Sequence, residues 1–295
     1  MQSLTISAPA KVNLFLGVGS IRPDGYHSVQ TVLHTLALAD RVTLTPADEL
    51  ELSCDVDLGI PAESNLAYRA ARAFSAAYGL DVLLDITLAK RIPAGAGLGG
   101  GSSDAAAVLA GLAHWAGLER DDLRLLDVAA SLGADVPFLL QGGAALMDGR
   151  GDHLVRSLKP IEATVVVVRP PAAVPTADAY RAFDADPQLV GDMRPVTDSV
   201  RFRDPRALAA GLANNMIPAA EALVPAIGDA LAFLRAETGV LGATMAGSGS
   251  AVFAICDSAL DAERISRVAE QRGWWSAATA LSAQGPVVTE SEMMV

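Results

Sequence analysis

The feature that most constrains this chain is a glycine-rich run between a predicted strand and a predicted helix. Residues 93–107 read PAGAGLGGGSSDAAA, after an alternating stretch at 82–88 typical of a strand and before an alanine-rich helical stretch reaching about Trp115. The glycines are Gly95, Gly97, Gly99, Gly100 and Gly101. Glycine lets a backbone approach a ligand closely, and a helix N-terminus presents free N–H groups to an anion. Because Ser102, Ser103 and Asp104 are good helix caps, the run predicts a phosphate-binding loop that feeds a capped helix.

Two common kinds of nucleotide loop do not fit this run. A Walker loop needs a lysine directly after the glycines, and none follows here. Gly95, Gly97 and Gly100 fit a dinucleotide fingerprint only loosely, since the run lies in mid-chain and no acidic residue stands clearly at the end of a following strand. A plain flexible loop is the alternative when the glycines are taken alone.

Composition favours a compact protein that binds small molecules. The chain has 295 residues, 51% hydrophobic and 19% charged, enough for one large or two ordinary domains. The net charge of −12 argues against a nucleic-acid partner. Cys54 and Cys256 lie far apart, which favours neither a disulfide nor a zinc site. Without a basic leader or a long apolar segment, we expect a soluble cytoplasmic protein with no membrane partner.

Hydrophobic patterning predicts a mixture of strands and helices along the chain. Strands are expected at residues 3–6, 12–18, 29–38, 41–46, 50–56, 82–88, 144–147, 153–156, 164–169, 251–256 and 275–281. Helices are expected at 66–78, 121–132, 176–183, 208–213, 224–237 and 259–272. Residues 184–206 are polar and contain prolines, which predicts irregular structure there, and the tail at 282–295 gives little sign of order. A second glycine-rich turn lies within 242–250, and we place a domain change near residue 159.

Five polar residues stand out by their surroundings. Lys11 and Asn13 interrupt an apolar segment, Tyr26 and His27 follow a Pro-Asp-Gly turn, and Asp135 lies among apolar residues before a proline. Each has an ordinary local explanation. The lysine could lie at a strand end, the aromatic and the histidine could be exposed at a hairpin, and the aspartate could form a turn or a cap.

Several motifs together resemble the superfamily named after galactokinase, homoserine kinase, mevalonate kinase and phosphomevalonate kinase (GHMP). They are APAKVNLFL at 8–16, the glycine-rich run, and AGSGSA at 246–251. RPDGYH at 22–27 and LGADVP at 132–137 resemble the branch of the superfamily that acts on a cytidine diphosphate-linked methylerythritol. The resemblance spans about residues 4–281, and the Tyr-His pair is more discriminating than the glycines. It outweighs the local explanations of these polar residues.

The resemblance implies a fold and an activity. The fold is α+β with a two-domain GHMP kinase architecture: an N-terminal ATP-binding domain (1–158), like ribosomal protein S5 domain 2, and a C-terminal ferredoxin-like α/β sandwich (159–295). The active site would lie in the cleft between them. The implied activity is ATP-dependent phosphorylation of the 2-hydroxyl of 4-(cytidine 5'-diphospho)-2-C-methyl-D-erythritol, a step of the non-mevalonate isoprenoid pathway, with ATP and Mg²⁺ as cofactors. Whether the protein is a monomer or a homodimer stays open.

Two alternatives stay open as well. The first is a GHMP kinase for homoserine, mevalonate or a sugar, against which Tyr26 and His27 argue because those substrates have no nucleobase. The second is a non-catalytic nucleotide-binding protein of the same fold. The presence of both Lys11 and Asp135 argues against it, since a pure binder needs no lysine–aspartate pair.

The resemblance also implies roles for individual residues. Asp135 would accept the hydroxyl proton or orient the hydroxyl, with Lys11 beside it to stabilise negative charge. The implied ATP-binding residues are Asn65, Leu66, Pro93, Ala94, Gly95, Ala96, Gly97, Leu98, Gly99, Gly100, Gly101, Ser102 and Ser103. The implied substrate-binding residues are Asn13, Tyr26, His27, Thr176, Tyr180, Gly247, Ser248 and Gly249. Ser102 or Ser103 would reach the magnesium shell, for which no dedicated carboxylate cage is visible. Asn214 and Asn215 depart from the family pattern, in which an acid often follows an asparagine.

Overall fold

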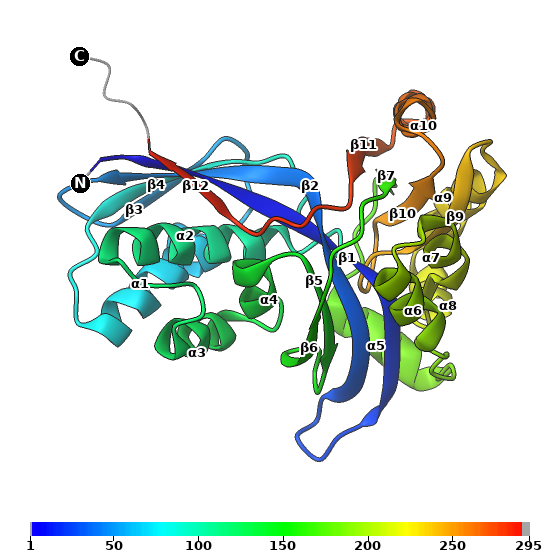
Figure 1. Cartoon of the computed structure of the whole chain (residues 1–295), viewed down its shortest axis with the longest axis horizontal. Coiled ribbons are helices and arrows are strands. Elements are labelled where there is room, and N and C mark those ends of the chain that lie inside the picture. The colour runs from blue at the N-terminus through cyan, green and yellow to red at the C-terminus, as the bar shows by residue number, and fades with distance from the viewer. Residues whose placement is uncertain (1, 291–295) are drawn as a thin grey trace.

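The computed structural model describes residues 2–290, which form two β-sheets with helices packed against them (Figure 1). Two long strands, β1 (Leu4–Ile21) and β2 (His27–Pro46), make the antiparallel hairpin that curves down through the molecule in Figure 1. The sequence predicted two shorter strands in place of each. The strands run on because bulges at Pro9–Lys11 and Asn13–Phe15 absorb the irregular residues without ending the pairing.

The remaining strands of the large sheet come from distant parts of the chain. They are β3 (Glu51–Cys54), β4 (Leu84–Ala89), β5 (Ala144–Asp148), β6 (His153–Leu158), β8 (Ala213–Asn214) and β12 (Val287–Glu290). Four helices and one turn of 3₁₀ helix (Ala62–Ser64) belong to the same half: α1 (Leu66–Tyr78), α2 (Gly100–Ala116), α3 (Leu123–Leu132) and α4 (Val136–Gln141). The helix α2 is buried along most of its length, and its small residues let it approach the sheet closely, with Gly111 against Leu44 and Ile6.

The second sheet is antiparallel throughout, in the order β11 (Trp275–Ala280), β7 (Thr164–Arg169), β10 (Val252–Cys256) and β9 (Val240–Met245). The four valines of β7 are all buried, with Val165 and Val167 in one hydrophobic cluster and Val166 and Val168 in another. Because apolar side chains pack on both faces of β7, every position of the strand can be apolar, which explains the uninterrupted run of valines. The helices of this half are α5 (Thr176–Ala185), α6 (Arg194–Phe202), α7 (Pro205–Gly211), α8 (Ile217–Leu223), α9 (Ala226–Ala236) and α10 (Ala259–Gln271).

Three regions differ from the sequence-based prediction. Residues 184–206 contain α6, because Pro195 occupies the first turn, where proline starts a helix rather than breaking it. The helix expected at 224–237 is α9, and α8 before it was not predicted. The helix expected at 208–213 is α7, which begins earlier at Pro205 and ends before β8. In the expected tail, residues 287–290 form β12, while 291–295 lie outside the described residues.

The two sheets share the end of the chain. The predicted domain change near residue 159 falls between β6 and β7, and so between the two sheets. After β11 the chain crosses back, and β12 pairs antiparallel with β1, as the red segment of Figure 1 shows. The predicted second domain therefore contributes its last strand to the first sheet. No helix among residues 2–290 is long and apolar enough to cross a membrane.

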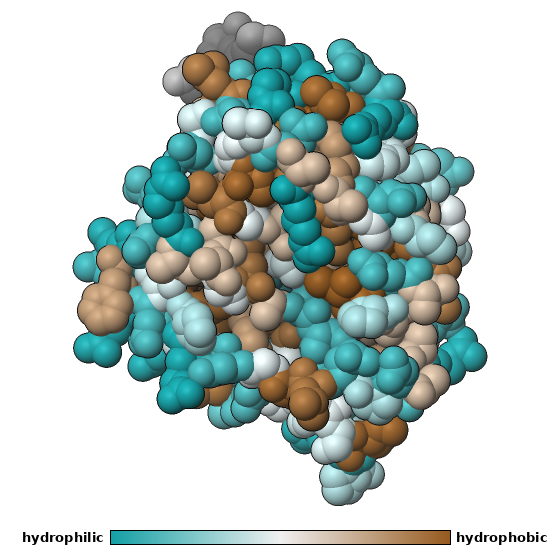
Figure 2. All heavy atoms as spheres, turned by 90° about the vertical axis from the view of Figure 1, so that its right-hand side faces the viewer, coloured by the Kyte–Doolittle hydropathy of each residue, from teal (hydrophilic) through white to brown (hydrophobic). Residues whose placement is uncertain are grey.

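The surface of the second half is mixed in character. On the side of the molecule that lies to the right in Figure 1, hydrophobic side chains are scattered among hydrophilic ones (Figure 2). Large exposed hydrophobic residues of this half include Phe202 on α6, Leu223 on α8 and Leu260 on α10.

A buried histidine joins the two halves. His34 on β2 is fully buried; its Nδ1 donates to the Thr35 carbonyl (2.9 Å) and its Nε2 accepts from the Ile161 N–H (3.2 Å). Both ring nitrogens are used by the neutral form, and burial lowers the pKa of His34 from 6.5 to about 4.

We expect this histidine to weaken the fold in acid. The unfolded chain binds the proton near pH 6.5 and the folded chain only near pH 4, so stability is lost as pH falls between these values, by up to about 3 kcal/mol. Chemical unfolding of the wild type and His34→Gln at several pH values between 4 and 8 measures this. The stability difference between the two proteins should shift against the wild type towards pH 4, and a constant difference would contradict the assignment.

Candidate active site

The glycine-rich run forms a loop whose shape depends on its glycines. Gly95, Gly97 and Gly99 all have positive φ (65°, 78° and 74°), a region that other residues rarely adopt. Gly99 is the N-cap, so α2 begins at Gly100, earlier than predicted. Ser102, Ser103 and Asp104 therefore lie inside the helix rather than capping it. The free N–H groups of the first turn belong to the loop glycines.

A cavity of about 360 Å³ lies against this loop. The expected ATP-binding residues that line it are Asn65, Leu66 and all of residues 93–102. Asn65 also caps α1, since its side-chain oxygen accepts from the Ala67 N–H (2.9 Å). Ser103 does not line the cavity, because its hydroxyl is buried and donates to the Pro9 carbonyl (2.7 Å). Leu58 and Ile60, which the sequence did not single out, complete one wall.

A second cavity, of about 300 Å³, lies on the other side of the loop, with Gly97, Gly99 and Ser102 lining both. Lys11 Nζ lies 3.5 Å from Asp135 Oδ2 in its wall and donates to Asn13 Oδ1 (3.0 Å). Asn13 is fixed in turn, since its Nδ2 donates to the Thr31 hydroxyl (2.9 Å). The structure thus brings the two predicted catalytic residues together beside the phosphate loop.

Local geometry explains why these two side chains are available. Asp135 precedes α4, but its side chain makes no capping hydrogen bond, so the carboxylate is free to face Lys11. Lys11 is buried at the β1 bulge, and its backbone N–H donates to the Leu98 carbonyl of the loop (2.9 Å). A Cβ on Gly99 would stand 3.0 Å from the Lys11 Cγ. Glycine therefore suits position 99 for two reasons: the backbone there has a positive φ, and a side chain would crowd Lys11.

The second glycine-rich turn closes the cavity from the other half. Gly247 donates its N–H to Asn13 Oδ1 (3.0 Å), and Gly247 and Ser248 line the cavity. Gly249 does not line it; its Cα faces Met245 and Ile227. A Cβ on Gly97 would overlap the Ala246 carbonyl, so the loop and the turn meet through bare backbone.

The two asparagines that depart from the family pattern have a structural role. Asn214 on β8 donates to the carbonyls of Met245 (2.9 Å) and Gly247 (2.8 Å). Asn215 accepts from the Val18 N–H (2.9 Å) and donates to the Val18 carbonyl (2.8 Å). The sequence singled out this stretch only as a departure from the family pattern. In the structure it ties the second turn to β1.

The aromatic residues form a group at the far end of the same cavity. Tyr180 and Thr176 on α5 line it. His27 is buried behind Tyr180, with ring centroids 5.0 Å apart, and its Nε2 lies 2.7 Å from Asp184 Oδ1. Tyr26 is 57% exposed and does not line the cavity. Of the three expected aromatic substrate-binding residues, Tyr180 lines the cavity, His27 packs behind it and Tyr26 lies outside it.

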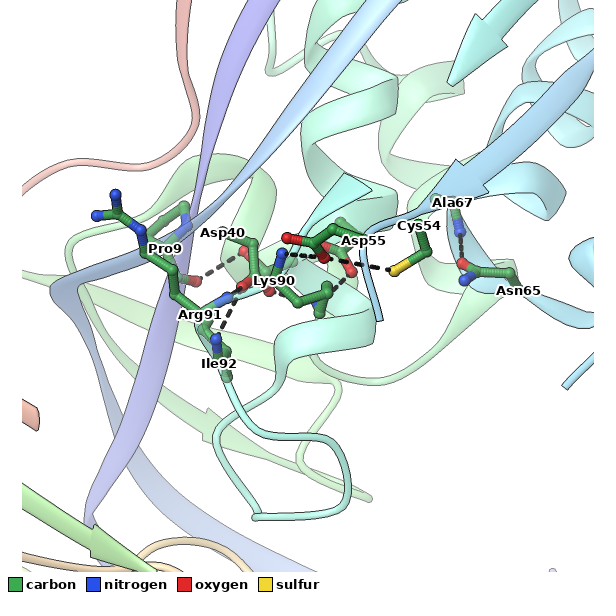
Figure 3. A network of polar contacts seen from close by, with 11 residues as sticks. Pro9, Asp40, Cys54, Asp55, Asn65, Ala67, Lys90, Arg91 and Ile92 are labelled. Carbon is green, nitrogen blue, oxygen red and sulfur yellow. Dashed lines mark hydrogen bonds and ion pairs between the residues drawn. The ribbon is translucent and has the colours of Figure 1, made fainter. Parts of the chain in front are cut away.

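A buried ionic cluster at the base of the loop was missed by sequence reasoning (Figure 3). The Lys90 ammonium contacts the carboxylates of Asp40 and Asp104, all nearly inaccessible. Asp40 also accepts from the N–H groups of Arg91 (2.6 Å) and Ile92 (2.8 Å), which lead into the loop. Oδ1 of Asp104 has no hydrogen-bond partner among residues 2–290, and burial raises the pKa of Asp104 to about 7. The cluster joins the strand before the loop to the helix after it.

Comparison with known proteins accounts for this arrangement. The GHMP kinases N terminal domain family matches residues 65–143, and the GHMP kinases C terminal family matches residues 197–273. The chain belongs to the GHMP kinase family. Its two-domain α+β architecture is the predicted one. ATP is the phosphoryl donor of such kinases, which agrees with the loop geometry.

This GHMP kinase is similar to its relatives over nearly their full length. It is 37% identical to a 4-diphosphocytidyl-2-C-methyl-D-erythritol kinase of Geobacter sulfurreducens, over 94% of this chain and 99% of the relative. It is 40% identical to one of Salinispora tropica, over 96% and 92%. A solved 4-(cytidine 5'-diphospho)-2C-methyl-D-erythritol kinase superposes with a TM-score of 0.79 at 36% identity, covering 95% of this chain and all of that one. A homoserine kinase of Cytophaga hutchinsonii has a TM-score of 0.78 at 21% identity, covering 98% of each chain, and so shares the fold.

We expect Lys90→Met to destabilise the kinase strongly. The change leaves two buried carboxylates facing each other without a cation, which costs about 3 to 5 kcal/mol at pH 8. Burial raises the pKa of Asp104 to about 7 even beside Lys90, and loss of that cation raises the pKa further, so protonation of Asp104 at pH 5.5 should recover part of the loss. Urea unfolding at the two pH values measures both effects, with the exposed Lys159→Met as control. A loss no larger than that of the control would contradict a stabilising cluster.

Proposed function

We propose that this GHMP kinase transfers the γ-phosphoryl group of ATP to the 2-hydroxyl of 4-(cytidine 5'-diphospho)-2-C-methyl-D-erythritol. One observation carries the catalytic part: Lys11 and Asp135 face each other 3.5 Å apart in a cavity that shares Gly97, Gly99 and Ser102 with the cavity under the phosphate loop. Relatives at 36–40% identity that carry this substrate's name support the choice of acceptor.

The proposed chemistry follows from this juxtaposition. The N–H groups of the loop and of the first turn of α2 hold the phosphates of ATP, and the acceptor hydroxyl lies near Asp135. As the hydroxyl oxygen bonds to the γ-phosphorus and the bond to the bridging oxygen breaks, the hydroxyl proton passes to the Asp135 carboxylate and ADP leaves. The Lys11 ammonium stabilises the charge that develops on the attacking oxygen.

The Mg²⁺ that normally accompanies ATP fits this site through one side chain. Residues 2–290 contain no group of three metal-ligating side chains. Mg²⁺ typically binds through phosphate oxygens, waters and few protein ligands, and it neutralises phosphate charge during transfer. The Ser102 hydroxyl, which lines both cavities, is our candidate ligand. Ser103 is not, because its hydroxyl is held by Pro9.

The acceptor specificity is expected to appear in a direct comparison of substrates. ADP release with ATP plus the cytidylated methylerythritol, homoserine or mevalonate should be fast only with the first. Asp135→Ala should lower kcat by at least a hundredfold while ATP binding, measured by calorimetry, stays within about twofold, because Asp135 lies outside the ATP cavity. Preference for homoserine or mevalonate would overturn the substrate, and near-normal turnover by Asp135→Ala would overturn the mechanism.

We expect the histidine behind Tyr180 to serve the cytosine end. His27→Ala removes the ring packed against Tyr180 and the partner of Asp184, so the pocket for the base should loosen. The KM for the cytidylated substrate should rise about tenfold, whereas the KM for ATP should change by less than twofold. His153→Ala, an exposed histidine on β6, is the matched control. Equal increases in both KM values would exclude His27 from the substrate site.

A further inference from the structure

One cation of the reaction cavity has no role in the mechanism above. Arg150 lies in the turn between β5 and β6 and lines the cavity together with Lys11, Asp135 and Tyr180. It and Lys11 are the basic side chains among the described residues that line this cavity. Lys11 is already engaged by Asp135 and Asn13. Arg150 is paired with Asp152 through only its Nε and Nη2, so it is a cation that can still meet an anionic group of the acceptor.

The turn that carries Arg150 is fixed in place. Gly149 and Gly151 flank it with positive φ (71° and 86°), and the Gly149 carbonyl accepts from the Val29 N–H of β2 (2.9 Å). Asp152 accepts from the Arg150 backbone N–H (3.0 Å), which tightens the turn further. The side chain thus begins from a defined point at the cavity wall.

The Arg150 guanidinium is held by Asp152 along one edge and by the Tyr26 ring against one face. Its Nε and Nη2 donate to Asp152 Oδ2 (2.9 and 2.6 Å), and its central carbon lies 4.9 Å from the centre of the Tyr26 ring. No hydrogen bond to Nη1 is found within residues 2–290. A guanidinium in this orientation still has N–H groups that can donate to phosphate oxygens. Its side chain is already ordered before a ligand binds.

The proposed acceptor has an anion at the matching place. Its diphosphate joins the cytidine to the methylerythritol chain that carries the hydroxyl. In the cavity, Tyr180 and the buried His27 mark the aromatic end, and Lys11 with Asp135 marks the reacting end. Since the protein carries a net charge of −12, an anionic substrate depends on local cations rather than on the overall field.

We propose that Arg150 binds the diphosphate of the acceptor substrate and so distinguishes cytidine diphosphate derivatives from uncharged or singly phosphorylated ones. This inference rests on the proposed function, because it names the group of that substrate which the residue contacts. Tyr26 then acts as the platform for the guanidinium, which gives that exposed ring a function beside the cavity.

The test compares Arg150→Ala and Arg150→Lys with the wild type in two assays. In steady-state kinetics, Arg150→Ala should raise the KM for the cytidylated substrate about tenfold, with kcat and the KM for ATP within twofold. Arg150→Lys, which keeps the charge but loses the planar fork, should fall between. In calorimetry, Arg150→Ala should weaken CDP binding about tenfold and leave cytidine binding unchanged.

A matched control separates contact from packing. Arg124 on α3 also lies over a tyrosine ring, that of Tyr78 at 5.4 Å, but it lines neither cavity of the site. Arg124→Ala should alter none of these constants, and the melting temperatures of all variants should be compared. Equal weakening of CDP and cytidine, an effect confined to ATP, or unchanged CDP binding would each overturn the inference. If the wild type fails to phosphorylate the cytidylated substrate, the proposed function fails, whereas CDP binding still reports on Arg150 independently.

Discussion

The arrangement of the site depends on the contact of bare backbone between the glycine-rich loop and the two structures that it touches. Gly97 meets the Ala246 carbonyl of the second half, and Gly99 lies against the Lys11 side chain of β1. A side chain at either position would push the loop away from one of these neighbours. The same glycines that give the loop its positive φ values therefore also set where the turn at 246–250 and Lys11 lie. The proposed phosphate binding and the contact between the two halves therefore both depend on one stretch of sequence.

Local patterns predicted the elements whose stability is local. Helix α1 and strand β7 have the predicted bounds, because a helical period with a cap, and a run of valines, are signals contained within one segment. Strand β12 could not be predicted in the same way, since it pairs with β1 across almost the whole chain. The prolines near residue 195 were read as a sign of irregular structure, although proline in a first turn is compatible with a helix.

The candidate site likewise contains residues that the sequence predicted and residues that it did not. Motif resemblance predicted Lys11, Asn13 and Asp135, which do lie together. It did not predict the Lys90 cluster, because Asp40 is fifty positions away in sequence and its closeness to Lys90 comes from the pairing of β2 with β4. In the sequence, Lys90, Asp40 and Asp104 look like solvated residues, and only the fold buries them. Burial also changes how much these charges contribute to stability. An exposed ion pair in water contributes little, whereas the buried Lys90 ammonium balances two carboxylates at the base of the glycine-rich loop.

The residues proposed to recognise the acceptor and those proposed to transfer the phosphoryl group come from different elements. The loop, Lys11 and Asp135 belong to the half that matches the N-terminal GHMP family or to the strand beside it, and they line the cavity in which we propose that transfer takes place. Tyr180 and Asp184 come from α5, His27 from the start of β2, and Arg150 from the β5–β6 turn. Exchanging these peripheral side chains would leave the loop undisturbed. A fold that separates the two sets of residues in this way is compatible with different acceptors, and a homoserine kinase at 21% identity shares this fold.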